Sequence, residues 1–333
     1  MANTIPKYFA SLQKLQNLSD LSLNFSRRGL DQEKNTTTES ISAGLILLKA
    51  LPIQNLSLHL STLYHSSDNL SLSRILPQFN LLKSLGLYFV DNQDQMHLRD
   101  RDLVGVLTCL REVPKLSSLT LSLSNLTQLL VTIGNVGEAL KLLPGLAELK
   151  LKFGRLNCTD EDMERLCSGL ECLSSLKSLE LGVDWIKEAT MKGIDALIKA
   201  LKKMVRIRNL SLNLSGNRFI TDQGFSNLCY SIKNLGNLAH LDINLSYGFH
   251  LNYKSAEELA ETLKSLDHLE TVGLNFIGFS GFYNGQGIFQ TLFEVLKKKK
   301  TIQDVNLTLG LNFFGLYPPE LLKFKQRKNL SLY

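Results

Sequence analysis

Apolar residues recur along this chain in a fixed short pattern, L-x-x-L-x-L-x-L, in which Ile, Val or Phe can replace Leu. The alternation of apolar and polar residues within each copy places the apolar side chains on one face, which predicts a β-strand. A fragment at Leu330–Tyr333 starts an eleventh copy. Ten complete copies, spaced 29 to 35 residues apart, begin at Leu18, Ile53, Leu82, Leu116, Leu146, Leu176, Ile207, Leu238, Leu269 and Ile302.

The residues between consecutive strands have the spacing of amphipathic helices. One such run follows Thr221 and Asp222, which are expected to cap a helix, and another follows Thr159 and the acidic residues 160–162. Ser255 with Glu258, and Asn135 with Glu138, have the spacing of capping boxes. The helix after Thr221 and Asp222 is predicted from the apolar residues Phe225, Leu228, Cys229, Ile232 and Leu235.

A strand followed by a helix cannot bury the apolar face of the strand alone, so neighbouring copies must stack. We therefore predict one right-handed α/β solenoid, with a parallel sheet on the concave face and helices on the convex face. Residues 1–17 are expected to form an N-terminal capping segment with a short helix that begins near Pro6, and residues 18–333 the repeat domain. The repeats end on a strand, so we expect either that a partner or a second copy of the chain covers that edge, or that the sequence is a truncated gene product.

The copies resemble leucine-rich repeats of the ribonuclease-inhibitor-like type. The stretch Leu210-Ser-Leu-Asn-Leu-Ser-Gly-Asn217-Arg-Phe-Ile-Thr-Asp-Gln-Gly224 is especially similar to repeats common in ciliate proteins. The Asn that closes the turn after the strand in this family is present as Asn217 and Asn92, and most other copies lack it.

The resemblance implies a non-enzymatic module for protein–protein interaction that acts as a scaffold, adaptor or assembly subunit. Its alternative implication is a regulator of a small GTPase, similar to Ran GTPase-activating proteins. In that case loop residues must reach the nucleotide site, and the candidates are Arg27, Arg28, Asn92, Arg155 and Arg218.

Most residues predicted to face the concave side are small and neutral, which disfavours nucleic-acid binding by this face. The charged and aromatic exceptions form a candidate partner-binding patch, although opposite charges on neighbouring strands are equally able to pair with each other. This concave patch consists of His59, Tyr88, Glu148, Lys150, Lys152, Lys177, Glu180 and Asp242.

Other combinations of residues give weaker indications of a binding or catalytic function. Asn213, Asn244 and Asn275 occupy one position on three successive strands, which predicts a ladder of stacked amides. Ser211, His240 and Asp242 are predicted to share one face, but the exposed site and the absence of a G-x-S-x-G motif argue against nucleophilic catalysis. No sequence motif indicates a metal, a nucleotide or another cofactor.

The net charge is +6, and residues 200–333 carry 16 Lys and Arg against 10 Asp and Glu. Lys297, Lys298, Lys299 and Lys300 follow a predicted helix and suggest a basic rim, either merely solvated or docked on an acidic protein, RNA or anionic membrane. Five scattered Cys, no secretory signal and no membrane-spanning run predict reduced thiols and a cytoplasmic location, with the nucleus as an alternative.

Overall fold

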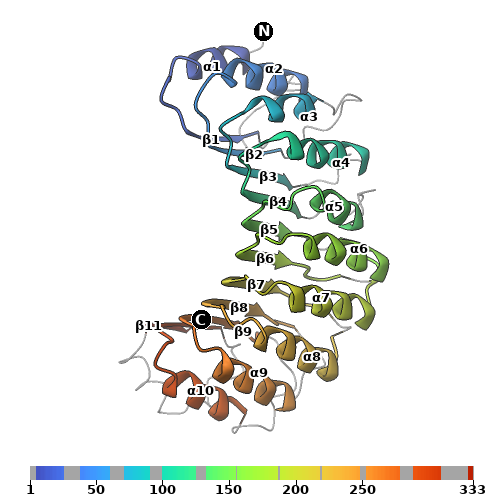
Figure 1. Cartoon of the computed structure of the whole chain (residues 1–333), viewed down its shortest axis with the longest axis vertical. Coiled ribbons are helices and arrows are strands. Elements are labelled where there is room, and N and C mark those ends of the chain that lie inside the picture. The colour runs from blue at the N-terminus through green and yellow to red at the C-terminus, as the bar shows by residue number, and fades with distance from the viewer. Residues whose placement is uncertain are drawn as a thin grey trace.

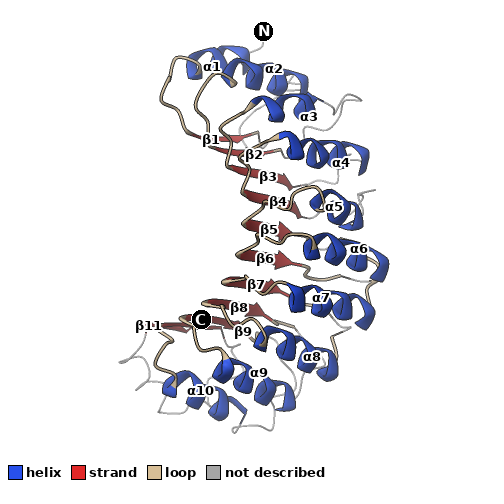
Figure 2. Cartoon of the chain, in the orientation of Figure 1, coloured by secondary structure: helices blue, strands red, loops and turns tan. Residues whose placement is uncertain are grey.

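The computed structural model is a curved stack of strand–helix units, with the strands side by side along the inner face and the helices along the outer face (Figure 1, Figure 2). It describes residues 5–25, 38–60, 71–90, 100–124, 133–154, 156–186, 188–217, 220–247, 253–277, 288–308 and 329–332. The strands form one parallel sheet of eleven in chain order from β1 to β11. The predicted fold class is confirmed.

Strands and helices alternate from β1 to β10, with a short 3-10 helix added after α3 and after α4. The strands are β1 (Asp20–Asn24), β2 (Asn55–His59), β3 (Ser84–Val90), β4 (Ser118–Ser124), β5 (Glu148–Lys152), β6 (Ser178–Gly182), β7 (Asn209–Asn213), β8 (His240–Asn244), β9 (Thr271–Asn275), β10 (Asp304–Thr308) and β11 (Asn329–Leu332). The helices are α1 (Ile5–Leu12), α2 (Thr38–Leu48), α3 (Ser71–Ile75), η2 (Leu76–Gln78), α4 (Asp100–Cys109), η3 (Leu110–Glu112), α5 (Ile133–Leu140), α6 (Asp160–Glu171), α7 (Met191–Lys203), α8 (Asp222–Lys233), α9 (Tyr253–Ser265) and α10 (Ile288–Lys298).

The register of the sheet follows the sequence repeat. Each strand from β1 to β10 begins two residues after the start of a pattern copy, and equivalent positions pair, as Leu181 does with Leu212. Both of these leucines are fully buried between the sheet and the helices. Burial of the leucine layer fixes the register because a shift by one residue would turn every leucine to solvent.

The structure confirms two predicted helix caps and corrects two others. Thr159 and Asp162 form a capping box at α6, and Thr221 accepts a hydrogen bond from the backbone N–H of Gly224 at α8. Ser255 and Asn135 lie inside α9 and α5, because each helix begins two residues before the predicted cap. Their side chains instead bond neighbouring repeats: Ser255 donates to Asp222, and Asn135 accepts from Arg165.

Helices α5 and α6 lie in close backbone contact. A Cβ atom placed on Gly169 would lie 2.1 Å from the carbonyl oxygen of Gly137. A Cβ on Gly137 would lie 2.3 Å from the carbonyl oxygen of Arg165. Glycine is therefore required at both positions for the two backbones to touch.

The first helix packs on the next unit. Phe9 of α1 is 2% exposed, and its ring lies where a side chain at Gly44 of α2 would be. This arrangement supports the proposal that residues 1–17 cap the first repeat, because a terminal repeat otherwise leaves its apolar flank open.

Asn217 joins two successive repeats just beyond the ends of β6 and β7. Its side-chain oxygen accepts from the N–H of Ile186 at 2.9 Å, and its amide donates to the carbonyl of Val183 at 2.7 Å. The side chain is 1% exposed, so these bonds satisfy backbone groups that water cannot reach. The turn-closing role expected for Asn217 is confirmed, whereas Asn92 lies outside the described residues.

Candidate functional site

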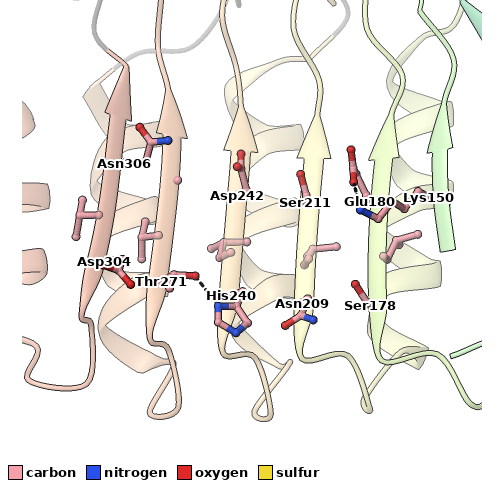
Figure 3. Close-up of a pocket in the computed structure, with 16 residues that line it drawn as sticks. Lys150, Ser178, Glu180, Asn209, Ser211, His240, Asp242, Thr271, Asp304 and Asn306 are labelled. Atoms are coloured by element: carbon pink, nitrogen blue, oxygen red, sulfur yellow. Dashed lines mark hydrogen bonds and ion pairs between the residues drawn. The ribbon is translucent and has the colours of Figure 1, made fainter. Parts of the chain in front are cut away.

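The inner face of the sheet contains a groove of about 400 Å³ that crosses β6 to β10 and reaches Lys150 on β5. Its polar side chains rise from neighbouring strands in rows that run across the sheet (Figure 3). One row, here called the groove row, passes through the middle of each strand. It consists of Lys150, Glu180, Ser211, Asp242, Gly273 and Asn306.

The charged side chains at the β5–β6 end of the groove pair with each other. Glu180 forms ion pairs with Lys150 at 3.3 Å and with Lys152 at 2.8 Å. Burial acts to raise the pKa of Glu180, but the hydrogen bonds and positive charges of the two lysines outweigh it and leave the pKa lowered. The interpretation that opposite charges pair across the sheet is confirmed for these three residues.

Four of the other predicted patch residues, His59, Tyr88, Glu148 and Lys177, do not line the groove. The rings of His59 and Tyr88 stack at 4.2 Å between centroids on β2 and β3, where Gly86 leaves room for the tyrosine ring. Glu148 accepts a hydrogen bond from Ser118. Lys177 precedes β6 and is not part of the strand. The predicted patch is therefore spread over several places on the concave side.

Asp242 differs from the other charged residues of the groove. Among the described residues, no side chain or backbone group donates a hydrogen bond to its carboxylate, and no cation pairs with it. Desolvation in the groove, followed by the negative charge of Glu180, raises its pKa. The other titratable side chains that line this part of the groove are His240 and Asp304. The folded protein thus holds an unpaired carboxylate in the groove, on β8.

We predict that Asp242→Asn makes the free protein more stable at neutral pH. A carboxyl group with a raised pKa binds its proton more tightly in the folded state, so its destabilising effect is fully present above that pKa and disappears as pH falls. In urea titrations at pH 7, the variant should therefore unfold at higher urea than the wild type. The difference should shrink as pH falls towards about 4, the usual range of an aspartate.

Asp195→Asn on the exposed side of α7 is the matched control for this change. It should leave the free energy of unfolding within about 0.5 kcal/mol of wild type at both pH values. A lower midpoint for Asp242→Asn at pH 7 would contradict the prediction.

The three residues considered for catalysis do not form a hydrogen-bonded set in the described structure. Nδ1 of His240 lies 2.6 Å from the hydroxyl oxygen of Thr271, on the next strand. Nucleophilic catalysis requires the base to contact the nucleophile and the carboxylate, and here the imidazole is bonded elsewhere. The geometry gives no support to hydrolysis by Ser211, His240 and Asp242.

The side chains of the three aligned asparagines form hydrogen bonds with the backbone. Asn213, Asn244 and Asn275 stand side by side on β7, β8 and β9. The side-chain oxygen of each accepts from the N–H two residues later, at 3.2, 3.0 and 3.1 Å. Asn213 also donates to Asp184. These bonds form turns at the strand ends, and the amide-to-amide ladder stays a prediction.

The predicted basic rim is partly engaged within the protein. Lys298 pairs with Glu294 of its own helix, and Lys299 donates to the carbonyl of Lys264 in the preceding repeat. Partial burial of the Lys299 amine lowers its pKa, against the opposing effect of Asp267. Lys297 belongs to the last turn of α10, and Lys300 follows that helix. Docking of this rim on an acidic partner stays a prediction.

An aromatic contact at the carboxyl edge of the sheet was missed by the sequence reasoning. Trp185, Gly216 and Tyr247 occupy equivalent places after β6, β7 and β8, and all three have positive φ. The rings of Trp185 and Tyr247 lie 5.6 Å apart, and Gly216 leaves the space that the indole fills. The 31-residue spacing of the three positions is the signal that could have revealed them.

All five cysteines are free thiols, as expected. Burial is the main cause of a raised pKa for Cys109, Cys158, Cys167 and Cys229, so these thiols are poor nucleophiles. Within the described ranges, no cluster of three His, Cys, Asp or Glu has the arrangement of a metal site. No helix of the described chain is long and apolar enough to cross a membrane.

The sequence repeat, the parallel strands in chain order and the buried leucine layer together define the architecture. The chain is a leucine-rich repeat solenoid. No protein-family model matches the chain. No curated protein matches it either.

Solved structures similar to this chain include the following three. One is the complex of Rad7 and Elc1 in yeast, at 16% identity, 99% coverage of this chain, 82% of that chain and a TM-score of 0.49. An internalin C2 from Listeria monocytogenes is 16% identical over 88% of this chain and 84% of its own, with a TM-score of 0.33. A leucine-rich repeat protein from Leptospira interrogans is 17% identical over 97% of this chain and 86% of its own, with a TM-score of 0.35.

Proposed function

We infer that this repeat protein is a non-enzymatic protein–protein interaction module that binds a partner protein in the concave groove. It would act as a scaffold, adaptor or assembly subunit. The observation that carries this proposal is the uneven use of polar groups along the inner face. Towards the N-terminus, several of these groups bond one another, as Asp20 does with Asn55 and Ser118 with Glu148.

In the groove, Lys150 pairs with Glu180 and His240 bonds Thr271, but several other polar side chains make no such bond. The side chains of Ser178, Asn209, Ser211, Asp242 and Asn306 make no hydrogen bond or ion pair with any other described residue. Polar groups that are ready to bond and set in a concavity are what a protein interface requires around its anchors. A solenoid also presents its inner sheet as a broad, rigid surface. These features support binding of a folded or extended protein segment across the strands.

The experiment compares two arginine substitutions on opposite faces of one repeat. Ser211→Arg places a long charged side chain in the groove, and Asn227→Arg places the same side chain on the exposed face of α8. Tagged full-length wild type and both variants are used for affinity purification from the native source, near physiological salt, with quantitative mass spectrometry. We expect a fixed set of proteins with the wild type and Asn227→Arg, and its loss with Ser211→Arg.

Equal recovery of the same proteins by both variants would contradict binding in the groove. Recovery of a small GTPase that depends on its nucleotide state would contradict the scaffold function and favour the regulatory alternative. The loop residues considered for that alternative, Arg27, Arg28, Asn92, Arg155 and Arg218, all lie outside the described residues.

A further inference from the structure

We propose that the groove recognises a basic side chain of the partner, an arginine in preference to a lysine, between Asp242 on β8 and Asn306 on β10. This inference rests on the proposed function and specifies what the groove binds. The two residues flank Gly273 on β9 in the groove row.

The first argument is space. Gly273 contributes no side chain, so the gap between Asp242 and Asn306 spans two strand intervals, or about 10 Å. The carboxylate of Asp242 leans towards this gap, since a Cβ on Gly273 would lie 2.8 Å from its Oδ2. A planar guanidinium fits such a gap between an oxygen on one side and an amide on the other.

The second argument is charge. Lys150 of the groove row and Lys152, two residues later on β5, both pair with Glu180. Asp242 has no such partner among the described residues. The β8–β10 part of the groove therefore attracts a cation, although the protein as a whole carries a net charge of +6.

The third argument is the set of acceptors. The two oxygens of Asp242 and the side-chain oxygen of Asn306 have no hydrogen-bond donor in the described structure. A guanidinium offers five N–H donors in a planar fork and can bond a carboxylate with two of them while others reach a second acceptor. An ammonium group has three donors on one atom and cannot span the gap in the same way.

The raised pKa of Asp242 agrees with this assignment. An unpaired, partly desolvated carboxylate is unfavourable in the free protein, and a bound cation would relieve that cost. The same substitution, Asp242→Asn, should then stabilise the free protein and weaken binding, a combination that a purely structural aspartate would not produce.

The test uses a defined probe, the peptide acetyl-Ala-Arg-Ala-amide, titrated into the ¹⁵N-labelled full-length protein. We expect the amide resonances of Gly273 and Asn306 to shift with saturation. The neutral isostere acetyl-Ala-citrulline-Ala-amide should give no such shift, and the lysine peptide should bind more weakly. Asp242→Asn should weaken binding of the arginine peptide about tenfold or more, the change expected for loss of a charge-assisted hydrogen bond.

Two glycine variants test whether binding of the arginine peptide needs the space over Gly273 as well as the charge of Asp242. Gly273→Ala should reduce binding of the arginine peptide, because its Cβ displaces the Asp242 carboxylate. Gly182→Ala, on β6 in the same sheet, is the control, because a Cβ there meets its neighbours only at 3.7 Å or more. Equal shifts with the citrulline peptide, or shifts that survive Asp242→Asn, would overturn the inference, as would an arginine peptide that causes none.

The outcomes also separate this inference from the proposed function. A partner protein that is lost with Ser211→Arg but retained at full affinity by Asp242→Asn would overturn the arginine site and leave the groove function standing. A peptide that binds as expected, in a protein whose partners are unaffected by Ser211→Arg, would overturn the groove function alone.

Discussion

Gly169→Ala should destabilise this protein by about 3 kcal/mol or more, because its new methyl group has no space between α5 and α6. The added Cβ would lie 2.1 Å from the carbonyl oxygen of Gly137, and a backbone atom cannot move aside as a side chain can. The two helices must separate, and the leucines beneath them then lose their contacts. Urea unfolding followed by circular dichroism measures the effect.

The effect of Gly169→Ala should also spread unevenly along the solenoid. Each repeat contacts only its neighbours, so a weakened α5–α6 interface divides the stack into two parts that can unfold separately. Hydrogen exchange should increase first in α5 and α6, and the unfolding transition should broaden.

Gly145→Ala is the matched control, because a Cβ at this turn position has no atom within 4 Å. It should change the free energy of unfolding by less than about 1 kcal/mol, with stabilisation the expected sign. If Gly169→Ala and Gly145→Ala had the same urea midpoint, the close contact between the two helices would be wrong.

Asn217→Ala should cost about 2–5 kcal/mol of stability, the second large effect that we expect. The change removes an acceptor for the N–H of Ile186 and a donor for the carbonyl of Val183, and it leaves both groups buried without a partner. Asn217→Asp should not restore stability, since its carboxylate oxygens cannot donate to that carbonyl. Thermal and urea unfolding of both variants measures the loss.

The control for Asn217 is Asn234→Ala at the end of α8. Asn234 is exposed, and its amide donates to the carbonyl of Tyr230, which water can satisfy in its place. This change should cost less than about 1 kcal/mol. A loss for Asn217→Ala as small as that for Asn234→Ala would show that the two buried bonds do not hold the repeats together.

Helix boundaries show how far local sequence signals reach. Thr159 was correctly predicted as a cap because acidic residues and an apolar helical run follow it directly. Ser255 and Asn135 have the spacing of capping boxes, yet α9 and α5 continue for two residues before them. Their polar side chains find better partners on the neighbouring helix, a contact between residues about thirty positions apart that local spacing does not reveal.

The sequence predicted which residues of the candidate site share one face of the sheet, but not which of their side chains interact. The repeat correctly aligned Lys150, Glu180 and Asp242 in one row of the sheet. Which charges pair depends on side-chain direction: Glu180 turns to the lysines of β5, and Asp242 turns to the empty space over Gly273. The same applies to His240, which bonds Thr271 and neither of the two residues considered with it.

The sequence by itself determined the solenoid, its strand register and its buried leucine layer. These properties follow from a repeated period, and burial of every leucine admits only one alignment of neighbouring copies. Only the tertiary structure decided the close α5–α6 contact, the stacking of His59 on Tyr88 and the unpaired state of Asp242. Each of these depends on rotamers and on residues about thirty positions away, whose distances and directions become fixed only when the repeats stack.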